Sequence, residues 1–162
     1  MVRGIIMAGV VAIALLAPTA SALGTAAWQP NVENPVTADD FYRRGLLRAL
    51  FHNDAPGALE DFNQALRLDP TETRVYHPRG ISRMELGDLE GAIQDFNEAL
   101  RVDSNLAEAY LTRGRAWAGL GDVQRALGDL QTAAQMFLAR GDNPRYSIAI
   151  GEIERLQGTA GN

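Results

Sequence analysis

The stretch YHPRGISRMELGDLEGAIQDFNEALRVDS, from Tyr76 to Ser104, decides the fold because it occurs in three versions along the chain. The segment from Tyr110, YLTRGRAWAGLGDVQRALGDLQTAAQMFL, follows it at an offset of 34 residues without a gap. The segment from Phe41, FYRRGLLRALFHNDAPGALEDFNQALRLDP, matches at both ends and carries one extra residue near His52 to Pro56. Self-similarity at a fixed period of about 20 to 50 residues indicates a repeat architecture.

Each unit reads as a pair of packed helices. Small residues recur where two helices would approach closely; they are Gly45, Gly80, Gly114, Ala58, Ala92, Ala126, Ala65, Ala99 and Ala133. Large residues recur between them and would fill the contact; they are Phe41, Tyr76, Tyr110, Phe62, Phe96 and Leu130. Gly87-Asp88 and Gly121-Asp122 are typical of a turn in which glycine ends one helix and aspartate caps the next.

The pattern Y-x-x-R-G…L-G-D…A-I-x-D-F-N-x-A-L-R-x-D resembles the tetratricopeptide repeat (TPR), over residues 39 to about 138. The resemblance implies an all-α fold, an α-solenoid of three TPR helical hairpins within residues 37–140, with units at about 37–70, 71–104 and 105–140. The third unit departs from the family, because Met136-Phe137-Leu138 stands where a proline-ended turn is preferred. We therefore expect its second helix to continue to Arg140.

A further helix is expected after the repeats. Gly141-Asp142 stops the preceding helix, Asn143 is suited to cap the next one, and Pro144 suits its first position. The apolar residues of the stretch 143–157 predict a C-terminal helix that covers the open face of the last hairpin, as repeat arrays require. Residues 158–162 are expected to form a flexible tail.

The beginning of the chain has the three parts of a secretory signal at residues 1–22. A weakly basic start is followed by the apolar run GIIMAGVVAIALLA from Gly4 and by the small-x-small sequence Ala20-Ser21-Ala22. The run is shorter than the roughly 20 residues that span a bilayer, which favours cleavage over a membrane anchor. Residues 23–36 predict an extended linker. We expect an exported protein, in a periplasm or outside the cell, or in the thylakoid lumen of a phototroph.

Composition excludes several kinds of chemistry. The chain has no cysteine, so disulfides and thiolate metal sites are ruled out, and its 15 basic residues are all arginine. The formal net charge of -5 argues against nucleic-acid binding. The two histidines, His52 and His77, fall on different repeats without a third ligand beside them, and no nucleotide-binding or hydrolase motif occurs. The sequence therefore predicts no enzyme, cofactor or metal site.

Arginine precedes the glycine of each unit, and aspartate precedes the large residue of the second helix. These residues are Arg44, Arg79 and Arg113, with Asp61, Asp95 and Asp129. We interpret them as ion pairs between helices, within a repeat or between neighbours, that set the register. The alternative is a row of arginines that faces a partner.

The TPR resemblance also implies a groove, because the first helix of each pair lines the inner face to which partners bind. The residues carried over to that face are Tyr42, Leu46, His77, Ile81, Met84, Leu111 and Arg115. This surface leans apolar and suits an amphipathic helix or an extended apolar peptide. Only Arg115 could serve the carboxylate recognition known in the family, so that specificity is not implied. Alternatively, the linker around Trp28 or the C-terminal helix covers part of the groove.

These observations favour an exported scaffold or adaptor that binds a protein or peptide partner of unknown identity, for example in complex assembly. The alternative is a structural subunit that associates with copies of itself as a homo-oligomer. Membrane contact is expected only through the signal segment.

Overall fold

The computed structural model describes residues 33–159 of the chain. In this part, seven α-helices and one short 3₁₀ helix follow one another: α1 Ala38–Phe51, α2 Ala55–Leu68, η1 Thr73–Val75, α3 Tyr76–Glu85, α4 Leu89–Val102, α5 Ala107–Gly119, α6 Val123–Ala139 and α7 Asn143–Thr159. Outside the described residues lie the predicted signal at residues 1–22, the linker up to residue 32, which includes Trp28, and residues 160–162.

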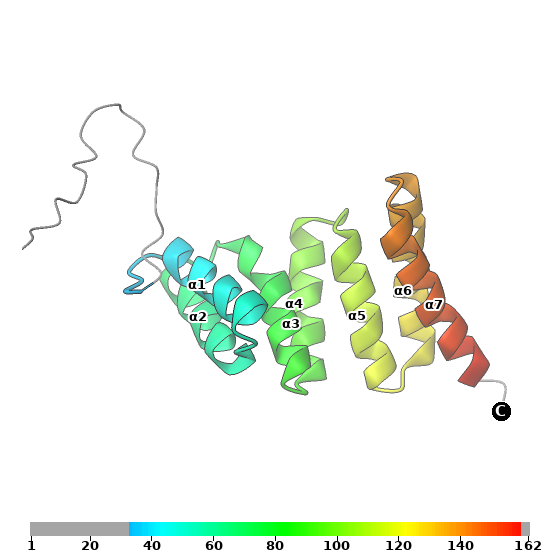
Figure 1. Cartoon of the computed structure of the whole chain (residues 1–162), viewed down its shortest axis with the longest axis horizontal. Helices are drawn as coiled ribbons and strands as arrows, with labels where there is room; N and C mark the ends of the chain where they lie inside the picture. Colours follow the sequence, from blue (N-terminus) through cyan, green and yellow to red (C-terminus); the bar gives the residue numbers. More distant parts are fainter. Residues whose placement is uncertain (1–32, 160–162) are drawn as a thin grey trace, which may run out of the picture.

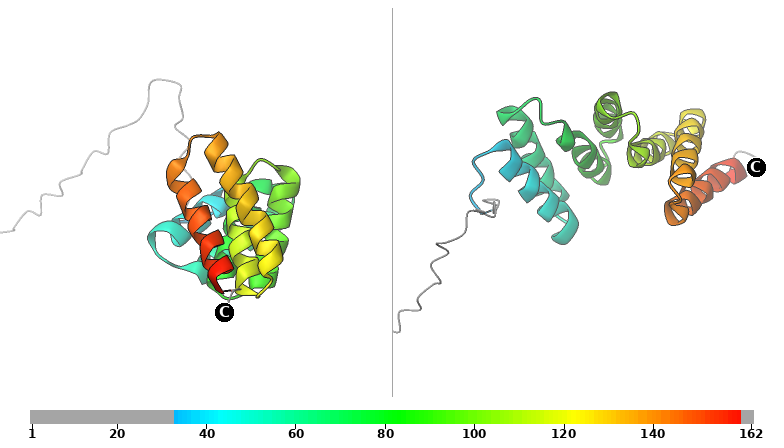
Figure 2. Two further views of the ribbon diagram at one scale, coloured as in Figure 1. Left: turned by 90° about the vertical axis from the view of Figure 1, so that its right-hand side faces the viewer. Right: turned by 90° about the horizontal axis from the view of Figure 1, so that it is seen from above.

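The helices form a row of antiparallel pairs, α1 with α2, α3 with α4 and α5 with α6, and α7 lies against α6 at the end of the row (Figure 1). Each helix packs mainly on its neighbours in sequence, so the core is divided among the pairs instead of forming one centre (Figure 2). This arrangement confirms the predicted α-solenoid of three TPR-type hairpins with a C-terminal capping helix.

Each hairpin closes where a glycine of its first helix meets a large side chain of its second. A Cβ added to Gly80 would lie 2.6 Å from Cε1 of Phe96, and one added to Gly45 would lie equally close to Phe62. Both phenylalanines are fully buried. The glycines are therefore required by the close approach of the helices, as the recurrence of small residues predicted.

Gly80→Ala should lower the free energy of unfolding by about 1–3 kcal/mol, because the methyl group overpacks the contact with Phe96. Gly128→Ala is the matched control, since Gly128 also lies within a helix and a Cβ there meets nothing within 4 Å. It should be neutral or stabilise by up to about 1 kcal/mol through helix propensity. Urea denaturation measures both, and equal losses in the two variants would contradict this packing role.

The turn inside each hairpin and the turn before α7 follow one pattern, with a residue of positive φ before a capping aspartate. Gly87, Gly121 and Gly141 have φ values of 84°, 81° and 71°, and Asn53 takes the same place in the first unit at 50°. Asparagine tolerates this conformation better than most side chains. The expectation that Asn143 caps α7 is wrong, because Asp142 Oδ1 accepts the Arg145 backbone N–H at 3.2 Å.

The boundaries of the last two helices differ slightly from those expected. The second helix of the third unit ends at Ala139, with Arg140 as its C-cap. The terminal helix continues past Gln157 to Thr159, into residues expected to be a tail.

The recurring arginines and aspartates form the predicted ion pairs between helices, and each pair lies within one repeat. Arg79 donates through Nε and Nη2 to the two carboxylate oxygens of Asp95, at 2.9 and 2.5 Å, and Arg83 Nη1 adds a third bond at 3.0 Å. The equivalent bidentate pairs join Arg44 to Asp61 and Arg113 to Asp129.

A second bond from the same arginine connects neighbouring hairpins. Arg79 Nη1 donates to Asn63 Oδ1 of the preceding hairpin at 3.1 Å, and Arg113 Nη1 donates to Asn97 Oδ1 at 2.7 Å. The Arg79 guanidinium also lies over the Tyr76 ring, 5.7 Å from its centroid. These contacts within the protein support the structural interpretation of the arginines over the alternative of a row that faces a partner.

Asp95→Asn should lower the free energy of unfolding by about 3 kcal/mol, because Asp95 is only 2% exposed and its loss leaves two partly buried guanidinium groups without their counter-charge. Glu98→Gln on the same helix is the control, since its pair with Arg101 is exposed to solvent. That change should cost less than about 1 kcal/mol. Chemical denaturation measures both variants. If Asp95→Asn leaves the free energy of unfolding unchanged, the ion pairs of Asp95 have no structural role.

Candidate functional site

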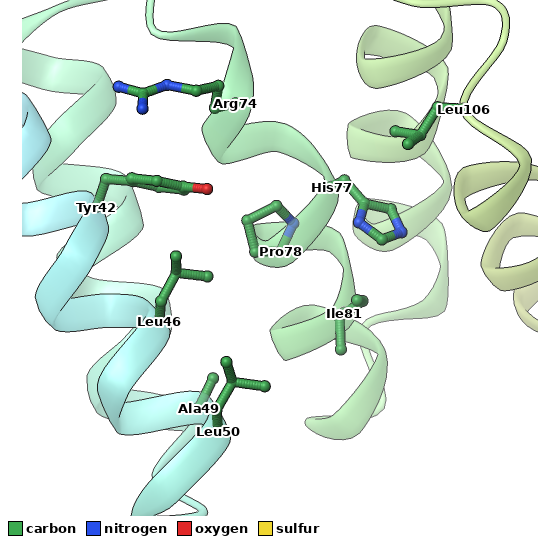
Figure 3. Close-up of a pocket in the computed structure, with 9 residues that line it drawn as sticks. All are labelled: Tyr42, Leu46, Ala49, Leu50, Arg74, His77, Pro78, Ile81 and Leu106. Atoms are coloured by element: carbon green, nitrogen blue, oxygen red, sulfur yellow. The ribbon is translucent and has the colours of Figure 1, made fainter.

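A pocket of about 420 Å³ lies between the first helices of the first two hairpins (Figure 3). Its lining consists of Tyr42, Leu46, Ala49, Leu50, Arg74, His77, Pro78, Ile81 and Leu106. Most of these side chains are aliphatic, and Figure 3 shows those of α1 facing those of α3 across the space. We call this feature the groove.

Helix periodicity explains how the residues come together. Tyr42, Leu46 and Ala49 are four and three residues apart on α1, so they share one face of that helix. His77 and Ile81 stand four apart on α3 in the same way. Pro78 lies in the first turn of α3. Backbone N–H groups in this turn have no hydrogen-bond partner within the helix, so proline is tolerated there.

Arg74 is the cationic side chain of the groove lining, and its charge is balanced by carboxylates of the protein itself. Arg74 Nη2 lies 2.9 Å from Asp39 Oδ1 and 2.6 Å from Glu72 Oε2, and the guanidinium is 5.0 Å from the centroid of the Tyr42 ring. The hydrogen bonds to Glu72 and Asp39 raise the pKa of Arg74. Burial raises the pKa of the Tyr42 phenol, which keeps that hydroxyl uncharged. The lining therefore offers an acidic ligand no unpaired cation.

His77 connects the groove to the second and third hairpins. Its ring centroid is 5.7 Å from that of Phe96, and its Nε2 is 3.3 Å from Thr112 Oγ1 on α5. Burial lowers the pKa of the imidazole below its ordinary value of 6.5, although Glu108 opposes this shift. His77 is accordingly neutral at pH 7 and acts as a polar, uncharged part of the wall.

The structure places the seven residues expected on the inner face in different surroundings. Four of them, Tyr42, Leu46, His77 and Ile81, line the groove together. Met84 does not reach it and packs against the buried cluster of the second hairpin.

The third hairpin contributes none of its expected residues to the groove. The expectation that Leu111 is exposed there is wrong, because Leu111 is 7% exposed and belongs to a buried cluster with Ala149 and Ile153 of α7. Arg115 Nε donates to Glu152 Oε1 of α7 at 3.2 Å. The C-terminal helix therefore covers part of the inner face, as the alternative of partial self-covering allowed.

Ala49, which the helical period places on the same face as Tyr42 and Leu46, also lines the groove. Sequence reasoning missed the other four residues of the lining: Leu50, Arg74, Pro78 and Leu106. Arg74 and Leu106 belong to the connections between hairpins, which the helical period does not place. Leu50 lies in the last turn of α1, next to the extra residue of the first unit, where comparison with the other units loses its register.

Two further features concern the part of the chain that the structure covers: membrane-spanning helices and metal-binding clusters. Among residues 33–159, no helix has both the length and the hydrophobicity needed to cross a bilayer. The same residues hold no cluster of three or more histidine, aspartate and glutamate side chains that could bind a metal ion.

The lowered pKa of His77 predicts a pH dependence of stability. The unfolded chain takes up a proton near pH 6.5, whereas the folded chain resists it, so stability should fall as the pH drops below that value. His77→Gln removes this contribution. Between about pH 7.5 and about pH 5.5, the wild type should lose more free energy of unfolding than His77→Gln, by at most about 1.4 kcal/mol per pH unit. Identical pH profiles would contradict the prediction.

Comparison with known proteins supports a TPR-type fold. Residues 80–121 match the family model described as TPR repeat. The first TPR of Spaghetti (RPAP3) bound to an HSP90 peptide is similar, with a TM-score of 0.68 and 17% identity over 78% of this chain and 94% of that one. PcrH from Pseudomonas aeruginosa is also similar, with a TM-score of 0.67 and 20% identity over 74% of this chain and 91% of that one. No curated protein matches this chain in sequence.

A third similar structure is a T3SS complex from Aeromonas hydrophila, with a TM-score of 0.70 and 18% identity over 76% of this chain and 82% of that one. At these identities the likeness concerns the fold alone. The class that fold and groove define is a TPR-type helical repeat protein with a groove between its first two hairpins.

Proposed function

We propose that this protein is a scaffold that binds an aliphatic segment of a partner protein in the groove between α1 and α3, and that its work is binding and not catalysis. The observation that carries the proposal is the lining itself, which presents mainly aliphatic side chains and a neutralised arginine. Burial of apolar surface would supply most of the affinity, at roughly 25 cal/mol per Å² removed from water.

Proteins of similar fold support this proposal through the ligands in their structures. The RPAP3 domain was solved with the HSP90 peptide SRMEEVD, and PcrH was solved with the chaperone binding region of PopD. A solenoid of helical hairpins can thus hold a segment of another protein.

The expected partner segment differs from an acidic peptide such as SRMEEVD. An acidic side chain in the groove would lose water without gaining an unpaired cation, because Arg74 is bound by Asp39 and Glu72. Arg115 is likewise bound by Glu152. We therefore expect a segment with aliphatic side chains at its contact positions and without carboxylates there, either extended or as one face of a helix.

The compartment is part of the proposal. The signal-like residues 1–22 support export, after which the protein would act as an adaptor in a periplasm, outside the cell or in a thylakoid lumen. We propose assembly of an exported complex as the role of such an adaptor.

Display of a random peptide library against the chain from Leu23 onward tests the groove. Selected peptides should be rich in leucine, isoleucine and valine and poor in aspartate and glutamate. Leu50→Asp should weaken their binding at least tenfold, because it places a carboxylate on the apolar lining at a side chain that is 73% exposed and can be changed without unfolding the hairpin.

Leu68→Asp is the matched control, since Leu68 is an exposed leucine of α2 outside the groove. It should bind the same peptides with unchanged affinity in fluorescence anisotropy. Selection of acidic peptides, or equal affinity for wild type and Leu50→Asp, would overturn the proposal.

A further inference from the structure

Two neutral polar groups interrupt the apolar lining of the groove, one on each wall. Tyr42 on α1 carries a hydroxyl, and His77 on α3 carries an imidazole (Figure 3). The third polar side chain of the lining, Arg74, is bound by Asp39 and Glu72 and lies over the Tyr42 ring. The hydrogen bonds that the groove can offer a bound segment therefore depend mainly on Tyr42 and His77.

The hydrogen bonds around His77 assign the proton on its ring. Thr112 Oγ1 has one hydrogen, which it donates to the backbone carbonyl of Glu108 at 2.9 Å or to that of Ala109 at 3.2 Å. The same oxygen lies 3.3 Å from His77 Nε2, so this contact is a hydrogen bond only if Nε2 is the donor. A neutral imidazole has a single N–H, and Nδ1 is therefore a hydrogen-bond acceptor.

The Tyr42 hydroxyl supplies a donor on the opposite wall. Within residues 33–159 its oxygen has no hydrogen-bond partner. Figure 3 shows this hydroxyl directed from α1 toward α3, and it shows a nitrogen of the His77 ring on the side that faces α1. No buried side-chain nitrogen or oxygen of the described residues lacks a partner, so solvent reaches both the Tyr42 oxygen and His77 Nδ1. The groove thus offers a bound group one donor and one acceptor.

The chemistry of the bound side chain decides whether these two groups stay paired. An aliphatic side chain displaces water from Tyr42 and His77 and returns no hydrogen bond, which weakens binding. A carboxylate has no hydrogen for Nδ1 and brings a charge into an apolar space. A carboxamide accepts through its oxygen and donates through its nitrogen. Because these are separate atoms, it suits partners on opposite walls better than a hydroxyl, which must serve both from one oxygen.

We propose that Tyr42 and His77 select an asparagine or glutamine side chain at one position of an otherwise aliphatic partner segment. The carboxamide oxygen accepts from Tyr42 Oη, and the carboxamide nitrogen donates to His77 Nδ1. This inference rests on the proposed function, since it assigns a specificity to the same groove. It gives the groove a means to distinguish one apolar segment from another, because a segment without the carboxamide leaves polar groups of the site unpaired.

Matched versions of one peptide test the pairing. Peptides selected from the displayed library on the chain from Leu23 onward should carry one glutamine or asparagine among aliphatic residues. A methyl ketone in place of the carboxamide keeps the oxygen and the shape but removes the N–H donors for His77, and leucine removes both bonds. Each change should raise the dissociation constant at least tenfold in fluorescence anisotropy. Selected peptides without a carboxamide, or a methyl ketone that binds equally well, would overturn the inference. Binding that Leu50→Asp still weakens would leave the proposed function in place.

Tyr42→Phe tests the other wall, because it removes only an oxygen that has no partner among the described residues. Its affinity for the carboxamide peptide should fall at least tenfold, whereas the leucine version should bind it as well as it binds the wild type. Tyr110→Phe is the matched control, since Tyr110 is a tyrosine of α5 outside the groove, and it should bind both peptides like the wild type. An equal loss for both peptides in Tyr42→Phe would mean that the hydroxyl does not recognise the carboxamide, and the inference would be wrong.

Discussion

The fold depends on an aspartate carboxylate that is buried in every hairpin. A carboxylate removed from water is stable only if its charge is balanced and its oxygens accept hydrogen bonds. Asp95 meets both needs through Arg79 and Arg83, which belong to the other helix of the hairpin. The pair therefore sets how one helix lies along the other. Because Arg79 also reaches Asn63, the same charge sets the position of the preceding hairpin.

The position of the groove follows from this constraint. The ion pairs and the contacts between glycine and a large side chain, such as Gly80 with Phe96, hold the hairpins closed. The bond from Arg79 to Asn63 joins α3 to α2 of the preceding hairpin, and the apolar space lies between α3 and the other helix of that hairpin, α1. The third hairpin is treated differently, because α7 packs on it and Glu152 binds Arg115. The apolar space that lines the proposed binding groove thus lies between the first two hairpins.

Much of the fold could be predicted because the repeat makes each local signal appear three times. The glycines, the capping aspartates and the pairing of arginine with aspartate each reflect contacts within one hairpin, between residues at nearly constant separation. The groove was predictable only in part. Helical periodicity correctly predicts Tyr42, Leu46, His77 and Ile81 on the lining. The prediction is wrong for Leu111 and Arg115, because both contact α7, a helix more than thirty residues away in sequence.

The sequence by itself determined the hairpins, their number and their order, since these depend on short-range packing and turn chemistry repeated along the chain. Only the tertiary structure decided which surfaces remain open. Exposure depends on what packs on a residue, and equivalent positions differ in this respect. Ala116 is fully buried beside Ile93 and Phe96 of the preceding hairpin, and Ser82 is also fully buried, whereas Leu47 is 38% exposed. The neutralisation of Arg74 by Asp39 likewise joins α1 to the segment before α3, a contact that no local pattern specifies.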